Sequence, residues 1–200
     1  MAFSLFCIII EWKGEIEMKY ATIKTHDIAN GPGVRVSLFV SGCRHHCKGC
    51  FNAETWDFCY GTPYTDDTRT EILDACNHDY ISGLSVLGGE PFEPENTPEV
   101  LRLITEFKQR YPEKTVWCYS GYTLEHMLRG ELDAQGKVRL MSDEETTHVR
   151  EILGQIDVLV DGEFHLEEKD LRLKFRGSGN QRLLNIPATL KTKNIVLWSE

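Results

Sequence analysis

The stretch that decides the fold is Val34 to Asn52, VRVSLFVSGCRHHCKGCFN. Its first seven residues, Val34–Val40, are mostly apolar and include three valines, which predicts a buried strand. The strand runs directly into a loop in which Cys43, Cys47 and Cys50 follow a C-x3-C-x2-C pattern, with two glycines among them. Three thiols this close in sequence can converge on one centre only where the backbone curls tightly, which glycine allows. The stretch therefore predicts a metal-binding loop at the end of the first core strand.

The number of cysteines in this loop bears on which metal it holds. A structural zinc site wants four protein ligands, commonly two C-x2-C pairs, and the chain has no second close pair. His45 or His46 could be a fourth ligand, but neither follows a usual zinc-finger spacing, and we expect both to be solvated loop residues. A cubane iron-sulfur cluster normally takes four cysteines, so three leave one iron open to another ligand.

Three further apolar runs predict strands that end in loops rich in small or acidic residues. Leu84–Leu87 ends at Gly88-Gly89, Thr115–Tyr119 at Ser120-Gly121, and Ile156–Val160 at Asp161-Gly162. Amphipathic patterns between these runs predict helices over 68–79, from Thr97-Pro98 onward, around 124–128, and from Ser142 to Gly154. Capping boxes at Thr68/Glu71 and Ser142/Glu145 are the predicted starts of the first and last of these helices.

Strands that alternate with helices imply right-handed crossovers and a mostly parallel α/β sheet. About four such units are too few for the eight-stranded barrel, which needs ~250 residues, so we predict a partial, open βα barrel. In parallel sheets the functional loops gather at the carboxyl ends of the strands, where the cysteines also lie. We predict one domain over residues 18–200, an N-terminal extension over 1–17, and irregular structure from Glu163 to Glu200.

Composition narrows the class of protein. The chain has 200 residues, 41% of them hydrophobic, and carries 31 acidic against 22 basic side chains, a net charge of −9. This charge repels phosphate backbones, which disfavours nucleic acid as a partner. The apolar run Phe3 to Ile10 is far shorter than the ~20 residues that span a bilayer, so no membrane anchor is expected. Seven unevenly spaced cysteines argue for a reducing, cytoplasmic protein, and Cys76 and Cys118 read as core residues.

The cysteine spacing resembles the signature of the radical S-adenosylmethionine superfamily. Further motifs are similar to one of its families, the activating proteins of anaerobic ribonucleoside-triphosphate reductase. These motifs are NGPGVR (30–35), SGCxxxCxGCFN (41–52), Thr55-Trp56, GGEP (88–91), SGYT (120–123), VDGEF (160–164) and RGSGNQR (176–182). The superfamily often has an aromatic residue before the last cysteine, whereas this chain has Gly49 there and Phe51 after it. The resemblance covers about residues 23–182.

This resemblance implies a specific site and reaction. Cys43, Cys47 and Cys50 would bind a 4Fe-4S cluster, and S-adenosyl-L-methionine would chelate the fourth iron. The reduced cluster would donate one electron to S-adenosylmethionine and cleave it to methionine and a 5'-deoxyadenosyl radical, and this radical would take a hydrogen atom from a backbone glycine of the reductase's large subunit. A flavodoxin-like or other low-potential donor would supply the electron. The residues implied to line S-adenosylmethionine are Gly49, Cys50, Phe51, Gly88, Gly89 and Glu90.

Other readings stay open on the sequence. The chain could activate another glycyl-radical enzyme, or be a small radical enzyme acting on a metabolite, although NGPGVR and RGSGNQR count against the latter. A zinc-binding interaction module is the non-enzyme alternative. The roles of five polar residues near the predicted site are undecided between structure and ligand or partner contact; they are Asp157, Asp161, Arg176, Asn180 and Gln181.

Overall fold

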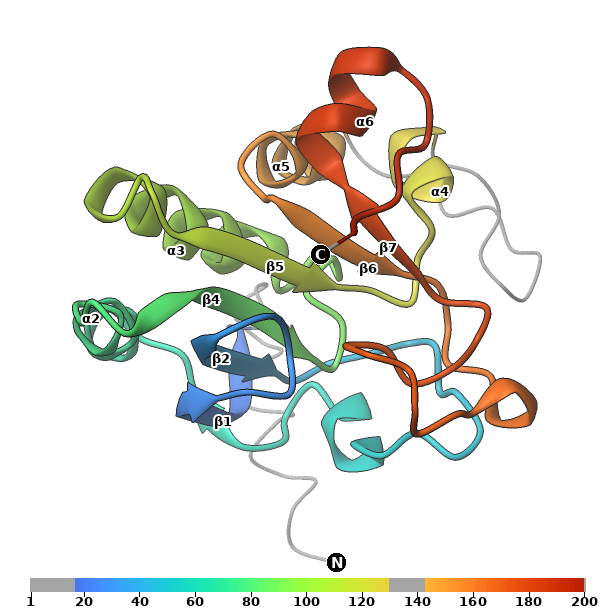
Figure 1. The fold of residues 1–200 in the computed structure, drawn as a ribbon. Coiled ribbons are helices and arrows are strands. Elements are labelled where there is room, and N and C mark those ends of the chain that lie inside the picture. Colours follow the sequence, from blue (N-terminus) through green and yellow to red (C-terminus); the bar gives the residue numbers. More distant parts are fainter. Residues whose placement is uncertain (1–16, 130–142, 200) are drawn as a thin grey trace, which may run out of the picture.

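Seven strands form one sheet in the computed structural model, which describes residues 17–129 and 143–199 (Figure 1). Along the sheet the strand order is β3-β1-β2-β4-β5-β6-β7. The bounds are β1 Lys19–Asp27, β2 Val34–Val40, β3 Thr62–Pro63, β4 Ile81–Gly88, β5 Thr115–Tyr119, β6 Val158–Asp161 and β7 Arg182–Asn185. The predicted extension over 1–17 and the cap at Ser142 lie, apart from residue 17, outside the described residues.

The four central strands are parallel, and the edges are antiparallel. β2, β4, β5 and β6 pair in parallel, β1 pairs antiparallel with both β2 and β3, and β7 pairs antiparallel with β6. The predicted open, mostly parallel α/β sheet is thus confirmed. The prediction of irregular structure after Glu163 was wrong in part, because β7 and the helix α6 (Ile186–Thr192) lie there. Asn185 begins α6 by accepting a hydrogen bond from the amide of Ala188, and Pro187 follows in the first turn.

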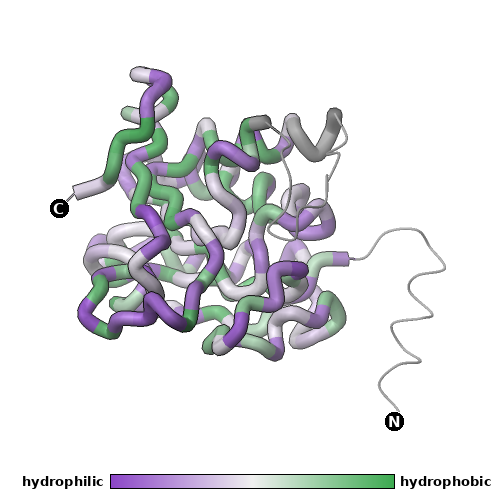
Figure 2. Tube along the Cα trace, turned by 90° about the vertical axis from the view of Figure 1, so that its right-hand side faces the viewer, coloured by the Kyte–Doolittle hydropathy of each residue, from purple (hydrophilic) through white to green (hydrophobic). Residues whose placement is uncertain are grey.

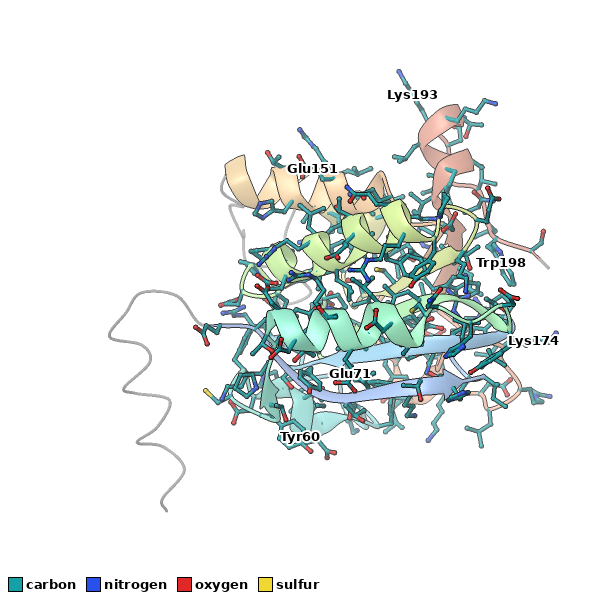
Figure 3. All side chains as sticks on the ribbon, turned by 90° about the vertical axis from the view of Figure 1, so that its left-hand side faces the viewer. Tyr60, Glu71, Glu151, Lys174, Lys193 and Trp198 are labelled. Carbon is teal, nitrogen blue, oxygen red and sulfur yellow. The ribbon has the colours of Figure 1, made fainter. Side chains whose placement is uncertain are left out.

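Helices cover one face of the sheet. In Figure 3, viewed onto this layer, helices lie side by side, and Glu71 and Glu151 are labelled on helices at opposite edges of the layer. The bounds are α2 Asp66–Ala75, α3 Thr97–Arg110, α4 Leu124–Arg129 and α5 Asp143–Leu153, with short 3-10 turns η2 at Ala53–Trp56 and η3 at Leu166–Glu168. The predicted cap of α2 was misplaced. Thr65, not Thr68, is its N-cap, and Thr68 is the residue that returns the second hydrogen bond of the box.

Successive side chains on the central strands point to opposite faces of the sheet. Those on one face join the main hydrophobic core, and Trp117, Val158 and Val160 form a smaller cluster on the other. Val36 and Leu38 on β2, and Cys118 on β5, point toward the helices, where the main hydrophobic core forms. Cys76 of α2 is part of the same core, as predicted. Hydrophobic and hydrophilic segments alternate along the Cα trace (Figure 2). Among residues 17–129 and 143–199, no helix has both the length and the hydropathy that a membrane span requires.

The face of the sheet opposite the helices carries buried polar groups around Arg35 of β2. Arg35, the last residue of the NGPGVR motif, is fully buried there and donates hydrogen bonds to the Ser85 hydroxyl (2.8 Å) and to the carbonyls of Leu84 (2.8 Å) and Thr115 (2.9 Å). Burial lowers the pKa of Arg35 to about 10. Arg35 therefore ties β2 to the middle of β4 and to the first residue of β5.

Aromatic rings close part of the concave face. Trp117 of β5 packs edge-on against Phe175 and Trp198, with ring centroids 5.3 Å and 4.9 Å away. The amide of Trp198 donates to the carbonyl of Leu183, which lays the C-terminal segment along β7. Figure 3 labels Trp198 and Lys174 on the same side of the molecule.

Candidate functional site

The loops that follow the four parallel strands meet at the carboxyl edge of the sheet. They enclose a cavity of about 120 Å³. In Figure 1 the loop after β2 and the segment after β6 run side by side at this edge. The cavity is lined by Cys43, His45, Cys47, Cys50, Phe51, Trp56, Leu87, Gly88, Gly89, Glu90, Tyr119, Ser120, Gly121, Gly162, Phe164 and Gln181. The structure thus brings together most of the residues that the sequence marked as functional.

Three free thiols border the cavity. Cys43 is buried, and Cys47 and Cys50 are half-buried. Gly49 adopts a left-handed conformation (φ 77°) that lets the chain turn between the last two cysteines, and the amide of Cys50 donates to the carbonyl of Cys47. Burial raises the pKa of Cys43 and of Cys47. A bound metal would displace these protons, because the thiolate is the ligand form.

The loop that carries the cysteines is fastened at its base. The amide of Arg44 donates to Oε1 of Glu93 (3.0 Å), and its guanidinium pairs with Glu93 and Glu95. The same guanidinium lies 4.4 Å from the ring centre of Phe58. Because Glu93 is fully buried, this pairing fixes the first turn of the cysteine loop against the segment after β4.

The Gly-Gly-Glu turn after β4 presses against the cysteine loop. A Cβ on Gly89 would lie 2.6 Å from the carbonyl oxygen of Gly42, so only glycine fits at this contact. The amide of Glu90 donates to the same carbonyl at 2.8 Å. The two loops that the sequence singled out are therefore in direct backbone contact.

Glu90 connects this turn to the loop after β5. Its carboxylate is fully buried and accepts hydrogen bonds from the hydroxyl of Ser120 (2.9 Å) and from the amides of Gly121 (2.8 Å) and Phe92 (2.9 Å). Each carboxylate oxygen thus already has at least one donor. Glu90 borders the cavity, and its carboxylate holds the cavity wall in place.

His45 is the side chain where sequence reasoning was wrong. We expected a solvated loop residue, but its side chain is only 7% exposed and lies between two carboxylates. Nδ1 is 2.9 Å from Glu163, and Nε2 is 3.3 Å from Glu90, within ion-pair distance but without hydrogen-bond geometry. Burial alone would lower the pKa of His45, but Glu163 and Glu90 raise it to about 10. His46 is exposed as expected and stacks on Trp56 at 4.7 Å.

Asp157 and Asp161, whose roles the sequence left undecided, have protein partners. Asp157 accepts from Lys108 and from the amide of Val116, both at 2.7 Å. Asp161 is buried and accepts from Arg182 and from the amide of Leu124. Neither aspartate borders the cysteine cavity.

The RGSGNQR segment is held by hydrogen bonds within itself and to the segment that follows β6. Arg176 donates to the carbonyl of Gln181, and Asn180 donates to the carbonyl of Glu163 (2.8 Å). The side-chain oxygen of Gln181 accepts from the amide of Gly177 at 2.8 Å, and its nitrogen donates to the carbonyl of Gly162. Of these three side chains, Gln181 reaches the cavity wall.

Sequence reasoning missed several residues of the site. Glu163, Ser120 and Gly121 stood in quoted motifs, yet no pairing with His45 or Glu90 was predicted for them. Tyr119 and Trp56 also border the cavity, and no signal in the sequence marked Tyr119. A second cavity of about 300 Å³ lies on the other side of His45, lined in part by Tyr122, His126, Asp161, Glu163 and Arg182.

The donor set fits an iron-sulfur cluster. In residues 17–129 and 143–199, no three His, Cys, Asp or Glu side chains are arranged around a single metal ion. Three thiols spaced around one cavity instead suit a cluster, in which each cysteine binds a different iron. The glycine-lined wall beside them leaves room for a further ligand.

Comparison with known proteins agrees with this chemistry. Residues 29–184 match the profile of a family described as a 4Fe-4S single cluster domain. Proteins named anaerobic ribonucleoside-triphosphate reductase-activating protein are similar over 82–83% of this chain. That of Vibrio cholerae is 40% identical, that of Pasteurella multocida 39% and that of enterobacteria phage T4 38%, with 96%, 95% and 93% of their own lengths covered.

The family match begins before β2, includes the cysteine loop and ends within β7. The chain belongs to the family of anaerobic ribonucleoside-triphosphate reductase-activating proteins.

Proposed function

We propose that this protein activates an anaerobic ribonucleoside-triphosphate reductase. It uses a 4Fe-4S cluster and S-adenosylmethionine, and it installs a glycyl radical on the reductase. The observation that carries the proposal is the meeting of three free thiols and a Gly-Gly-Glu turn around one cavity at the carboxyl edge of a parallel sheet. An interaction module without chemistry has no need of such a cavity beside its cysteines.

In this proposal Cys43, Cys47 and Cys50 hold three irons of the cluster. S-adenosylmethionine fills the adjoining cavity, where Cys50 and Phe51 line one side; Gly49, which precedes them in the chain, is not among the residues that border the cavity. Gly88, Gly89 and Glu90 line the other. When bound, the cluster and S-adenosylmethionine supply a 5'-deoxyadenosyl radical.

The protein itself positions the cluster and S-adenosylmethionine, and it leaves one side of the cavity accessible to the reductase. Arg44 and His45 fix the cysteine loop, and Glu90 fixes the loops after β4 and β5. Because the sheet is open, a glycine-bearing loop of the reductase can approach from the concave side. Phe51, which is 83% exposed, lies at the rim of the cavity on this route.

Partners and location are part of the same proposal. The reductase's large subunit is the protein substrate, and a flavodoxin-like or similar low-potential protein supplies the electron. Low-potential iron-sulfur clusters span potentials down to about −700 mV, so the donor must also be strongly reducing. A cytoplasmic location suits a protein whose cluster ligands must remain reduced thiols. The activity belongs to one domain over residues 18–200.

Electron paramagnetic resonance tests this function. Iron-loaded, reduced protein is incubated anaerobically with S-adenosylmethionine and the purified cognate reductase. We expect a glycyl radical signal on the reductase that is absent when S-adenosylmethionine is left out. If S-adenosylmethionine is cleaved but the reductase acquires no radical, the assignment to this reductase is wrong.

A further inference from the structure

The loop over residues 166–178 starts and ends beside the cysteine cavity. At its start, Leu166 lies against the cysteine loop, because a Cβ on Gly49 would be 2.9 Å from the Leu166 side chain. Near its end, a Cβ on Gly177 would be 3.0 Å from the ring of Phe164, which borders the cavity. The 166–178 loop is therefore part of the surface around the mouth of the cavity.

Phe175 holds this loop against the face of the sheet opposite the helices. Its ring packs edge-on against Trp117 of β5, and its centroid lies 6.2 Å from the nearer ring of Trp198. Its backbone is left-handed (φ 58°), which is uncommon for a residue other than glycine and persists only where the surroundings hold it. An isolated β-bridge between Lys169 and Ser178 joins the two arms of the loop. The loop thus has a fixed position on the side from which the reductase approaches.

The tip of the loop presents an apolar side chain to solvent. Leu171 lies in a turn that the amide of Leu173 closes by donating to the carbonyl of Asp170. Within residues 17–129 and 143–199, Leu171 (91% exposed) and Phe51 are the two most exposed large apolar side chains, and Leu166 is exposed as well. Single exposed leucines are common on proteins, but these three residues lie on two contacting segments around one cavity. Their grouping indicates a surface that a partner covers.

The charge around Leu171 has the opposite sign to that of the whole chain. Residues 169–176 contain four basic side chains and one acidic side chain, a surplus of three positive charges in a chain with a net charge of −9. Figure 3 labels one of the basic residues, Lys174, at the edge of the molecule. Acidic groups on a partner would be attracted to this segment and repelled by the protein as a whole. Charge therefore favours this loop as the point of contact for an acidic surface.

We propose that the 166–178 loop is a docking site for the reductase's large subunit, in which Leu171 enters an apolar pocket rimmed by acidic side chains. The inference rests on the proposed function and deepens it, because it names where the protein substrate binds outside the cavity. A protein that places a backbone glycine in the cavity must cover the cavity mouth, and this loop forms part of that mouth. Contact at Leu171 adds affinity without taking the space of S-adenosylmethionine.

Leu171→Asp tests this assignment, because it removes the apolar contact and adds a charge that acidic side chains repel. Ile28→Asp is the matched control. Ile28 is 74% exposed, but it lies between β1 and β2, at the opposite end of β2 from the cysteine loop. The first measurement is the Kd of iron-loaded protein for the purified cognate reductase, by anaerobic biolayer interferometry. Iron content, S-adenosylmethionine cleavage by chemically reduced protein without reductase, and oligomeric state by light scattering complete the set.

For Leu171→Asp we expect the Kd for the reductase to rise more than about tenfold, the effect typical of losing a central apolar contact. Iron content, cleavage of S-adenosylmethionine without reductase and the oligomeric state should match the wild type, because the side chain is exposed. Ile28→Asp should bind the reductase as the wild type does. Added salt should weaken wild-type binding, because it screens the attraction between the loop and an acidic rim.

Three results would overturn the docking site. The first is wild-type affinity in Leu171→Asp, and the second is an equal loss of affinity in both variants. The third is a wild-type dimer that Leu171→Asp dissociates without changing the affinity for the reductase, since the loop would then contact a second copy of this chain. Binding that does not respond to salt would reject the acidic rim.

The proposed function fails on a different result. Wild-type protein that cleaves S-adenosylmethionine but neither binds the reductase nor forms a radical on it would reject the proposed function, and the docking site with it. Radical formation by the wild type together with unchanged reductase binding by Leu171→Asp would reject the docking site alone.

Discussion

Cys47→Ala is expected to abolish the iron-sulfur cluster. Anaerobically reconstituted wild-type protein should hold about four irons per chain, and the variant less than about one, because two thiolates cannot retain a cubane. Cys43→Ala and Cys50→Ala should do the same. The loss should be visible as a colourless protein, and iron analysis with the visible absorption spectrum measures it. Glycyl radical formation should fall to background in all three variants.

Cys76 and Cys118 supply the controls for this prediction. Both thiols are free and fully buried in the helix-side core, away from the cavity. Cys76→Ala and Cys118→Ala should keep a full cluster, at the cost of about 1 kcal/mol or more of stability from lost packing. If Cys76→Ala loses as much iron as Cys47→Ala, or if any variant of the cysteine triplet keeps a full cluster, the ligand assignment is wrong.

Glu90→Ala is expected to cause the second large effect. The substitution removes a buried carboxylate and leaves the donors of Ser120, Gly121 and Phe92 without an acceptor. Removing one partner of a buried charged network typically costs ~3–5 kcal/mol. Because Glu90 borders the cavity and its carboxylate holds two of the loops that form the cavity wall, the Kd for S-adenosylmethionine should rise by more than about tenfold. Iron content should stay at the wild-type level, since the cysteines remain.

Glu93→Ala separates lost stability from lost binding. Glu93 is equally buried and belongs to the same turn, but it pairs with Arg44 and does not border the cavity. We expect this variant to unfold more readily, while its iron-loaded form binds S-adenosylmethionine with nearly wild-type affinity. Denaturant unfolding and anaerobic calorimetry measure the two effects. Loss of iron in Glu90→Ala would instead show that Glu90 acts by supporting the cysteine loop.

The parallel core of the fold could be predicted from sequence because its signals are local. The strand Thr115–Tyr119 has the predicted bounds, and so does Val34–Val40, since each is a short, mostly apolar run that is followed by a Ser-Gly pair. The antiparallel edges could not be found in this way. β3 has two residues, and β7 is the polar-flanked run Arg182–Asn185, too short and mixed for a period to appear.

The candidate site was predictable only as far as its motifs are contiguous. The cysteine loop and the Gly-Gly-Glu turn are each a contiguous stretch of sequence, and both contribute residues to the cavity wall. The connections between loops are not local. His45 meets Glu163 across 118 positions of sequence, and Ser120 meets Glu90 across 30. Such pairs depend on how the strands align, which the sequence pattern does not specify.

Two glycines of these motifs are required by contacts between loops that only the structure shows. A Cβ on Gly121 would lie 2.5 Å from the His45 ring, just as one on Gly89 would meet the carbonyl of Gly42. The loops after β4 and β5 therefore both pack against the cysteine loop through glycine. This packing brings the ends of separate strands close enough to share one ligand.

Mössbauer spectroscopy of ⁵⁷Fe-loaded protein, with and without S-adenosylmethionine, tests most directly whether three cysteines hold a cluster with one open iron. We predict a 4Fe-4S spectrum in which the ligand changes the parameters of a single iron and leaves the other three as they were. A spectrum that does not respond to S-adenosylmethionine, or a fourth iron bound by a side chain of this same protein in the presence of the ligand, would contradict the account.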